Sequence, residues 1–313
     1  MNWISNLLWF WTLLITPVAI FFPDVFIPFR ALIKPLLGSV ILAMGLTLKF
    51  EDFKPILLQP KKVLVGILSQ YTVMPLSGLL IGLLLFYNLP KDFIAGQILT
   101  GSCPTGVVSN VYNFLAQASV ALSISLSAIN TVIAPFLTPY ITAVLAGKII
   151  HVDINKLFID MIQVTLLPVC LGIIINSFFE KRLQKIKSFL PIYSTLTVVF
   201  IIGFVVASGH EKILTLGYKA LFLLFLASFF HLFFGYILGY MIAKLFNFEE
   251  KYAVTVSIET AMQNSGLATV LALSQWGGGA AFPAITYSVV QNIFGPFVCN
   301  MFRNRIFLRP PDL

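Results

Sequence analysis

Polar side chains gather in one apolar stretch near the end of the sequence. The segment SIETAMQNSG, residues 257–266, carries the carboxylate of Glu259, followed by Gln263, Asn264 and Ser265. A charged side chain at the centre of a membrane-spanning helix costs about 3 kcal/mol on insertion scales, so it persists where it has a partner or a water-filled cavity. No Lys or Arg of the sequence falls at the same depth of a predicted span. We therefore expect a proton or a cation from solution to balance the charge of Glu259.

A row of hydroxyl and amide groups favours a cation over a proton. Ser119, Ser123, Ser127 and Asn130 follow one another at spacings of four, four and three, which places them on one face of a helix. A proton needs one carboxylate, whereas a hard cation such as sodium needs several oxygens in place of its waters. We predict sodium, with Ser123 and Ser127 near the ion and Ser119 serving helix packing. Other spans add further oxygens, from Gln70, Ser109, Asn110, Gln291 and Asn292.

The composition places these residues in a membrane. Of 313 residues, 58% are hydrophobic and 10% are charged, which leaves too little polar surface for a soluble domain. Apolar runs of about 20 residues, the length that crosses a bilayer, predict an all-α integral membrane protein with ten transmembrane helices. The first run is treated as a span because its N-terminal flank lacks a positive charge and no small-residue cleavage pattern follows it. The predicted spans are 6–22, 29–48, 62–87, 93–116, 119–147, 156–179, 189–208, 219–244, 251–273 and 282–302.

The basic residues predict the orientation. An even number of spans puts both termini on the same side of the membrane. Thirteen of the 20 Lys and Arg residues fall on that side and seven on the other, so both termini are expected in the cytoplasm, in a multi-pass protein of the cell inner (plasma) membrane. The net charge of +8 then reflects topology and attraction to anionic lipid headgroups, and no feature indicates nucleic acid as a partner.

Two predicted spans carry residues that break a helix. SCPTG, residues 102–106, interrupts the fourth span, and residues 259–266 interrupt the ninth. Each is the fourth span of a five-span half, and halves with an odd number of spans enter the membrane from opposite sides. Two inverted five-helix repeats have this arrangement, in which paired interrupted helices point to a transport site near the midplane. Simple kinks are the alternative, because Pro and Gly are common in transmembrane helices.

Two motifs resemble a known family. The stretch CPTGVVSNVYNFLAQASVALSISLS, residues 103–127, together with ETAMQNSGLA, residues 259–268, is similar to the bile acid:sodium symporter family, specifically its ten-helix bacterial members. The similarity extends to MGLTLKFEDF at 44–53 and to QYTVMP from Gln70. The resemblance implies that the discontinuous helices 4 and 9 cross in a core domain that packs on a panel domain. The core is expected at residues 61–150 and 213–313, and the panel at residues 1–60 and 151–212.

The resemblance also implies a set of binding residues. The family has two sodium sites behind the crossing, and its substrate cavity lies where the restarting helices present a positive dipole end to an anion. By motif position, the first sodium site consists of Ser109, Asn110, Ser123, Ser127 and Glu259. The second consists of Gln70, Glu259, Thr260, Met262 and Gln263, with Thr260 and Met262 contributing backbone carbonyls. The substrate residues are expected to be Thr105, Gly106, Val107, Asn264 and Asn292. The family commonly has a second glycine and then a hydroxyl residue where this chain has Thr105 and Val107, and this departure bears on the polar contacts of the substrate.

These features predict sodium-coupled secondary active symport of an organic anion by alternating access, and not an enzyme. The anion is bile-acid-like or a smaller carboxylate or sulfonate, and the protein is expected to be a monomer in the lipid bilayer. The alternatives in transport are a proton-coupled carrier and an arsenite- or auxin-type carrier that uses Cys103. An enzyme with Glu259 as base needs a second catalytic group at the same depth, and the sequence offers none. A channel is less favoured because interrupted inverted repeats are typical of alternating-access transporters.

Overall fold

The described part of the chain is helical throughout. The computed structural model describes residues 8–106 and 108–308, and within them the extended backbone is limited to one isolated bridge. The α-helices are α2 (Leu8–Phe21), α3 (Ile33–Gly45), α4 (Lys54–Leu58), α5 (Pro60–Leu85), α6 (Lys91–Ser102), α7 (Val108–Leu115), α8 (Val120–Ala146), α9 (Ile154–Met161), α10 (Leu167–Lys187), α11 (Leu190–Ser208), α12 (His210–Leu245), α13 (Glu250–Ala261), α14 (Ser265–Trp276) and α15 (Gly278–Leu308). A π-helical turn, Ile162–Leu166, joins α9 to α10, and short 3-10 turns cover Pro23–Val25, Ile27–Leu32 and Phe50–Phe53.

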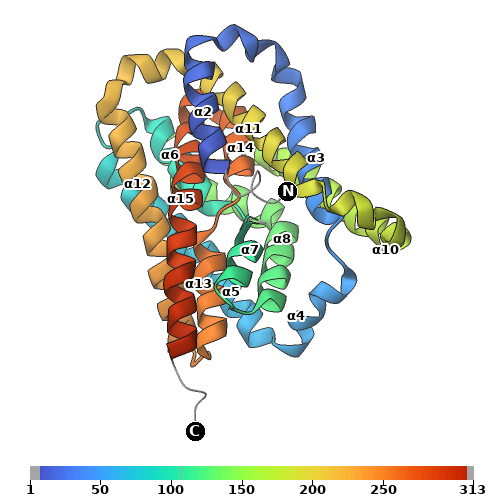
Figure 1. The fold of residues 1–313 in the computed structure, drawn as a ribbon. Helices are drawn as coiled ribbons and strands as arrows, with labels where there is room; N and C mark the ends of the chain where they lie inside the picture. The colour runs from blue at the N-terminus through green and yellow to red at the C-terminus, as the bar shows by residue number, and fades with distance from the viewer. Residues whose placement is uncertain (1–7, 107, 309–313) are drawn as a thin grey trace.

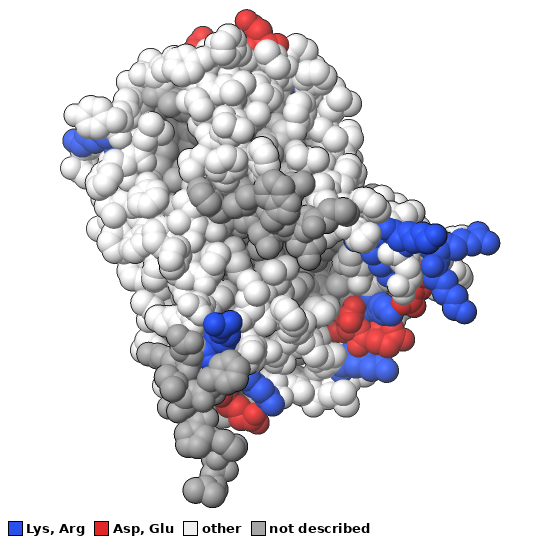
Figure 2. All heavy atoms as spheres, in the orientation of Figure 1, with Lys and Arg blue, Asp and Glu red and all other residues white. Residues whose placement is uncertain are grey.

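Six helical stretches of the described residues are long and apolar enough to cross a bilayer. Their surface is correspondingly apolar, and Figure 2 shows a wide area without charge between charged edges. The protein is therefore a multi-pass membrane protein. The six stretches, Ile27–Gly45, Pro60–Leu85, Val120–Ala146, Ile154–Lys187, Leu190–Ser208 and Gly217–Leu245, overlap six of the predicted spans.

The fourth and ninth predicted spans are each broken into two short helices. The first break separates α6 from α7, and the second separates α13 from α14. In Figure 1, α6 and α14 lie above the point where the breaks meet, and α7 and α13 lie below it. The second break is shorter than the sequence predicts, because α13 stays helical to Ala261 and only residues 262–264 leave the helix. Glu259 therefore sits in the last turn of a helix and not in the break itself.

The two breaks satisfy each other's backbone groups. Thr105 and Gln263 form an antiparallel bridge. The Gly106 amide donates to the Met262 carbonyl at 3.0 Å, and the Asn264 amide donates to the Pro104 carbonyl at 2.9 Å. Because an unpaired buried amide or carbonyl is costly where water is excluded, this exchange allows helices to be interrupted inside the bundle.

Two groups of helices pack around this crossing. The first contains α5, α6, α12 and α13, with α5 between α6 and α12. In the second, α3 packs on α10 and α2 packs on α11. The α3–α10 contact needs glycine, because a Cβ added to Gly45 would lie 2.5 Å from the Val169 carbonyl oxygen. Gly172 occupies the facing position on α10 and is equally closely packed.

Candidate cation site at the crossing of the broken helices

The carboxylate of Glu259 is the centre of a buried polar cluster. The residue is 1% exposed. Its Oε1 accepts hydrogen bonds from Ser123 Oγ at 2.6 Å and from Asn113 Nδ2 at 3.1 Å. Its Oε2 accepts from Ser127 Oγ at 2.9 Å. Ser123 and Ser127 lie one turn apart on α8, so the spacing of four in the sequence directs both hydroxyls at one carboxylate.

The start of α7 completes the cluster. Ser109 Oγ lies 3.3 Å from Ser127 Oγ, and Asn110 Oδ1 accepts from Ser123 Oγ at 2.6 Å. The structure thus brings together the five residues expected for the first sodium site, from helices α7, α8 and α13.

Asn113 belongs to the same cluster, although the sequence reasoning did not single it out. It follows Ser109 by four residues and Asn110 by three, which is the spacing that shares one face of α7. This helical spacing is the signal that would have identified it.

The hydroxyl of Ser123 lies between two oxygen acceptors. The single hydroxyl hydrogen of Ser123 faces both Glu259 Oε1 and Asn110 Oδ1, each at 2.6 Å. It can bond one of them at a time. A cation that binds several oxygens supplies the missing positive charge, and carboxylate, hydroxyl and amide oxygens suit a hard cation. Within the described residues there is no group of three or more His, Cys, Asp or Glu side chains that could hold a softer metal.

A second polar set lies at the break after α13. Gln70 Nε2, on α5, donates to the Cys103 carbonyl at 2.8 Å and to Gln263 Oε1 at 2.9 Å. Gln263 Nε2 donates to the Thr260 carbonyl at 2.8 Å. Gln70, Thr260 and Gln263 are therefore in contact, and Met262 is adjacent to them, with its carbonyl accepting from the Gly106 amide. The hydrogen bonds of the Glu259 carboxylate are all made with the first set. Glu259 is assigned to the second set as well only because it directly precedes Thr260 in the chain.

Gln291 braces this break from α15. Its Oε1 accepts from the Gln263 amide, and its Nε2 donates to the Gln263 carbonyl, both at 3.1 Å. The sequence marks Gln291 as a polar residue of the last span but does not reveal this pairing.

Three of the residues expected to contact substrate, Thr105, Gly106 and Asn264, meet at the crossing of the two breaks. Thr105 is buried, and its hydroxyl donates to the Glu259 carbonyl at 2.9 Å while accepting from Asn130 Nδ2 at 3.2 Å. Gly106 lies against the other break, since a Cβ there would be 2.9 Å from the Gln263 carbonyl oxygen. Asn264 caps α14 by accepting from the Leu267 amide at 3.1 Å.

Asn292 is the exception among the expected substrate residues, and it faces α7. Its Oδ1 accepts from the Tyr112 hydroxyl at 3.4 Å, and its Nδ2 donates to the Ser288 carbonyl at 2.7 Å. Val107, the last residue expected to contact substrate, lies outside the described residues.

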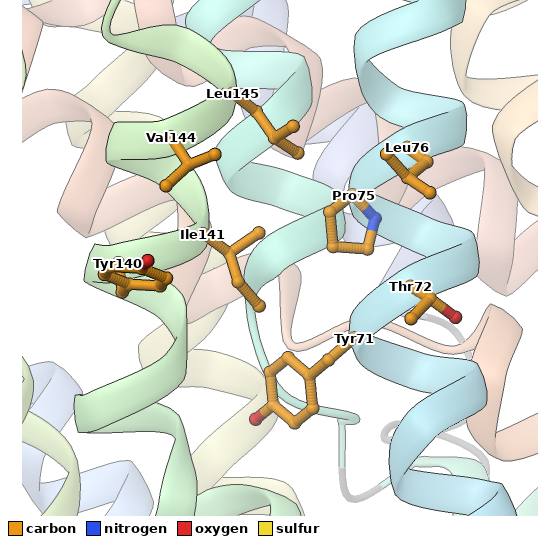
Figure 3. A pocket seen from close by; sticks show the side chains of 8 residues that line it. All are labelled: Tyr71, Thr72, Pro75, Leu76, Tyr140, Ile141, Val144 and Leu145. Atoms are coloured by element: carbon orange, nitrogen blue, oxygen red, sulfur yellow. The ribbon is translucent and has the colours of Figure 1, made fainter.

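An apolar pocket of about 240 Å³ lies between α5 and α8. Figure 3 shows side chains of both helices reaching toward the space between them. The Tyr71 hydroxyl donates to the Asn130 carbonyl at 3.0 Å. Because Asn130 also bonds to Thr105, this side of the pocket lies next to the crossing of the broken helices. None of the expected sodium or substrate residues that the structure describes lines it. The lining residues are Tyr71, Thr72, Pro75, Leu76, Tyr140, Ile141, Val144 and Leu145.

Glu259 is not the only buried carboxylate among the described residues. Asp160, on α9, is 4% exposed. It forms an ion pair with Lys34 of α3 and accepts from Ser274 Oγ of α14 at 2.7 Å. The sequence places Asp160 close to a connector, and its burial depends on partners distant in the chain.

Comparisons with known proteins show what the chain is similar to. Residues 34–216 match the family described as the sodium bile acid symporter family. A Bacillus subtilis protein named as the uncharacterized sodium-dependent transporter YocS is 34% identical over 296 residues, which cover 95% of this chain and 90% of that protein. Chloroplastic proteins of rice and Arabidopsis, each named as the probable sodium/metabolite cotransporter BASS1, are both 36% identical. This chain covers 65% of the length of each plant protein.

Proposed function

The chain belongs to the sodium bile acid symporter family, and on that premise we propose that it is a sodium-coupled secondary active symporter of an organic anion that works by alternating access. Its relatives are named as sodium-dependent transporters, which makes the protein a transporter and not an enzyme. The observation that carries the proposal is the Glu259 carboxylate, which is buried among hydroxyl and amide groups where two broken helices meet.

The proposed architecture has ten transmembrane helices in two inverted five-helix repeats. Its support is the reciprocal pairing of the breaks, because two segments related by a two-fold axis exchange equivalent hydrogen bonds. In this arrangement the segments α5 to α8 and α12 to α15 form the core domain, which matches the expected residues 61–150 and 213–313 apart from the first residues of α5 and α12. The panel domain, residues 1–60 and 151–212, contains α2, α3, α10 and α11, whose mutual packing supports the division.

Two sodium ions are proposed, one in each polar set. The first is bound by Ser109, Asn110, Ser123, Ser127 and Glu259, and the second by Gln70, Thr260, Met262 and Gln263 with Glu259. An ion in the first set connects α7 and α13, which belong to the two broken spans, with α8, which forms the fifth predicted span. Sodium binding therefore orders the crossing, and this ordering couples the ion to a substrate that binds there.

The proposed substrate is an amphipathic organic anion, bile-acid-like or a smaller carboxylate or sulfonate. Its anionic group is expected near Thr105, Gly106, Val107 and Asn264, where α7 and α14 begin and present the positive ends of their dipoles. Asn292 is proposed to contact the substrate from α15. Movement of the core against the panel then exposes this place to each side of the membrane in turn.

Both termini are proposed to be cytoplasmic, in a monomer of the cell inner membrane. In Figure 2 most Lys and Arg atoms lie along the lower and right-hand edges. Contacts of Lys49 with Glu180, of Lys62 with Tyr252 and of Lys244 with Glu250 connect residues on the side assigned to the cytoplasm. This clustering supports the orientation that the basic residues predict.

Thermal stability of the purified protein tests the proposal directly. We expect sodium, titrated against potassium or choline at constant ionic strength, to raise the melting temperature in a saturating manner, because an ion that binds the folded state stabilises it. Candidate anions are then expected to raise it further only when sodium is present. No sodium-specific rise between pH 5 and 9 would overturn the proposed coupling ion. In liposomes, sodium-driven accumulation of the anion against its gradient identifies a carrier, whereas mere equilibration identifies a channel.

A further inference from the structure

Asn113 contacts the carboxylate of Glu259, although the motif positions give it no role. It is 0% exposed and lies on α7, one turn after Ser109. Its Nδ2 is 3.0 Å from the Ser109 carbonyl oxygen, 3.0 Å from Ser123 Oγ and 3.1 Å from Glu259 Oε1. An amide nitrogen has two hydrogens, so the three oxygens around it cannot all be hydrogen-bonded at once.

The oxygen of the same amide has too few hydrogen-bond partners, whereas the nitrogen has too many. Asn113 Oδ1 is buried and has no hydrogen-bond donor among the described residues. A buried amide oxygen without a partner is costly, and it is usually explained by water, by an ion or by a functional role. The side chain therefore combines an oxygen that needs a positive partner with a nitrogen that has three oxygens around it.

We propose that Asn113 is an additional ligand of the sodium ion at Glu259, a role that its Oδ1 takes up by rotation of the side-chain amide. The oxygen and nitrogen of an amide are nearly the same size, so rotation exchanges them without a change of shape. Rotation brings Oδ1 toward Ser109, Ser123 and Glu259. Several oxygens gathered around one point repel one another unless a cation lies between them.

The amide thus has two roles at one position. With the nitrogen toward the cluster, it donates to the Glu259 carboxylate, as the structure shows. With the oxygen toward the cluster, it binds the ion. This inference rests on the proposed sodium site and adds to it a residue that neither the motif positions nor the comparisons assign.

An unpartnered amide oxygen is not sufficient to identify a ligand. Asn176, on α10, is also buried and also has an unpartnered Oδ1, and its Nδ2 donates to the Leu48 carbonyl at 2.6 Å. What distinguishes Asn113 is the carboxylate and the two serine oxygens around its nitrogen. Asn176 is therefore the matched control, because it has the same residue type and burial but a backbone carbonyl as its partner.

The test is a sodium titration of thermal stability on the full-length protein and three variants. Asn113→Ala removes both amide atoms, and we expect its sodium affinity to fall at least about tenfold, since a polar contact with an ion is lost. Asn113→Asp keeps an oxygen on both branches of the side chain, so sodium-specific stabilisation persists. Asn176→Ala lowers the melting temperature in the absence of sodium but leaves the sodium affinity unchanged.

The results separate this inference from the proposed function. If wild type shows sodium-specific stabilisation and Asn113→Ala binds sodium as tightly or more tightly, Asn113 is only a hydrogen-bond donor and the inference is overturned while the function stands. If wild type shows no sodium effect, both are overturned. Should Asn113→Ala fail to fold, Asn113→Asp decides alone when it is measured up to pH 9, because two adjacent carboxyl groups can hold a proton in place of the ion at lower pH. Loss of the sodium effect over that whole pH range in a folded Asn113→Asp protein excludes ligation by this side chain.

Discussion

Asp160 and Glu259, two of the buried carboxylates among the described residues, are balanced in different ways. Asp160 pairs with the ammonium group of Lys34 and with the hydroxyl of Ser274, so its charge is neutralised within the chain. Glu259 is bonded by hydroxyl and amide groups, and no basic side chain contacts it among the described residues. A carboxylate with its own cation in the chain needs no particular ion from solution. A carboxylate without one makes stability depend on an ion from solution, which is what a coupled transporter needs.

The two sites also differ in what they connect. Asp160 links α3, α9 and α14, and its partner Lys34 keeps 42% of its side chain exposed. Glu259 links α7, α8 and α13, and Asn113, Ser123 and Ser127 around it are all fully buried. Salt therefore screens the first site in part and the second hardly at all. Specific binding, and not ionic strength, should govern the Glu259 site.

Replacing Glu259 with Gln is the strongest way to break this comparison. Glu259→Gln keeps the size of the side chain and removes its charge, so no buried charge remains to attract sodium. Sodium-specific stabilisation and sodium-driven uptake are expected to disappear. Stability without sodium is expected to stay equal or rise, because an uncompensated buried charge is costly. Thermal melts in sodium and in choline at one ionic strength measure both effects.

Glu180 provides the matched control for Glu259. It pairs with Lys49 at an exposed position, where an ion pair contributes little to stability. Glu180→Gln is therefore expected to leave the sodium effect intact. A sodium effect that survives in Glu259→Gln would show that the ion binds elsewhere, and the two carboxylates would then not differ in the way proposed.

Removing the ammonium group of Lys34 tests the comparison at the Asp160 site. Lys34→Ala leaves Asp160 buried without a cation, and the free energy of unfolding is expected to fall by about 1–3 kcal/mol. The loss should be equal in sodium and in choline, as measured by denaturation in both salts. The combined variant Lys34→Met with Asp160→Leu should recover part of the stability, because apolar residues often replace a buried ion pair without loss.

A new sodium dependence in Lys34→Ala would contradict this view. It would mean that a lone buried carboxylate is enough to recruit the ion. The serine and asparagine oxygens around Glu259 would then not be needed for selectivity.

Much of the crossing could be predicted from the sequence because its signals are local. Pro104 and Gly106 stand two residues apart and disfavour a helix in the same short segment, and Ser123 and Ser127 face one way because they are four residues apart. Glu259 stands out by its charge alone. These properties require no knowledge of how the helices pack.

The remainder depends on contacts that are distant in the chain. Asp160 meets Lys34 across 126 residues and Ser274 across 114, so its burial cannot be inferred from its neighbours in sequence. The length of the second break was also misjudged, since Thr260 and Ala261 stay helical although polar and small residues surround them. The role of Asn113 lies between these cases, because its spacing is visible in the sequence but the oxygens around it come from three helices.

Single serine replacements give a smaller and more graded test of the Glu259 site. Ser123→Ala removes one hydroxyl that bonds the carboxylate, and sodium affinity is expected to fall about tenfold. Ser119→Ala is the control from the same helix face. Its hydroxyl caps α8 by accepting from the Leu122 amide at 3.4 Å, so its loss is expected to lower stability by about 0.5–1 kcal/mol without changing sodium affinity. Equal sodium affinities in the two variants would show that the serine row serves packing throughout.

The smallest effect is expected at Cys103, and it separates the sodium-coupled carrier from the arsenite- or auxin-type alternative. Cys103 is 0% exposed, and it contacts Gln70 of the second polar set through its backbone carbonyl, which Cys103→Ala retains. We expect unchanged sodium affinity and uptake, with stability lowered by about 1 kcal/mol for the small cavity left by the sulfur. Uptake assays with the candidate anion, together with sodium-dependent melts, measure these quantities. Loss of uptake in a folded Cys103→Ala protein would show that transport depends on the Cys103 thiol. The uncompensated carboxylate of Glu259 would then serve a carrier that depends on sulfur, and the contrast with Asp160 would no longer identify the coupling ion.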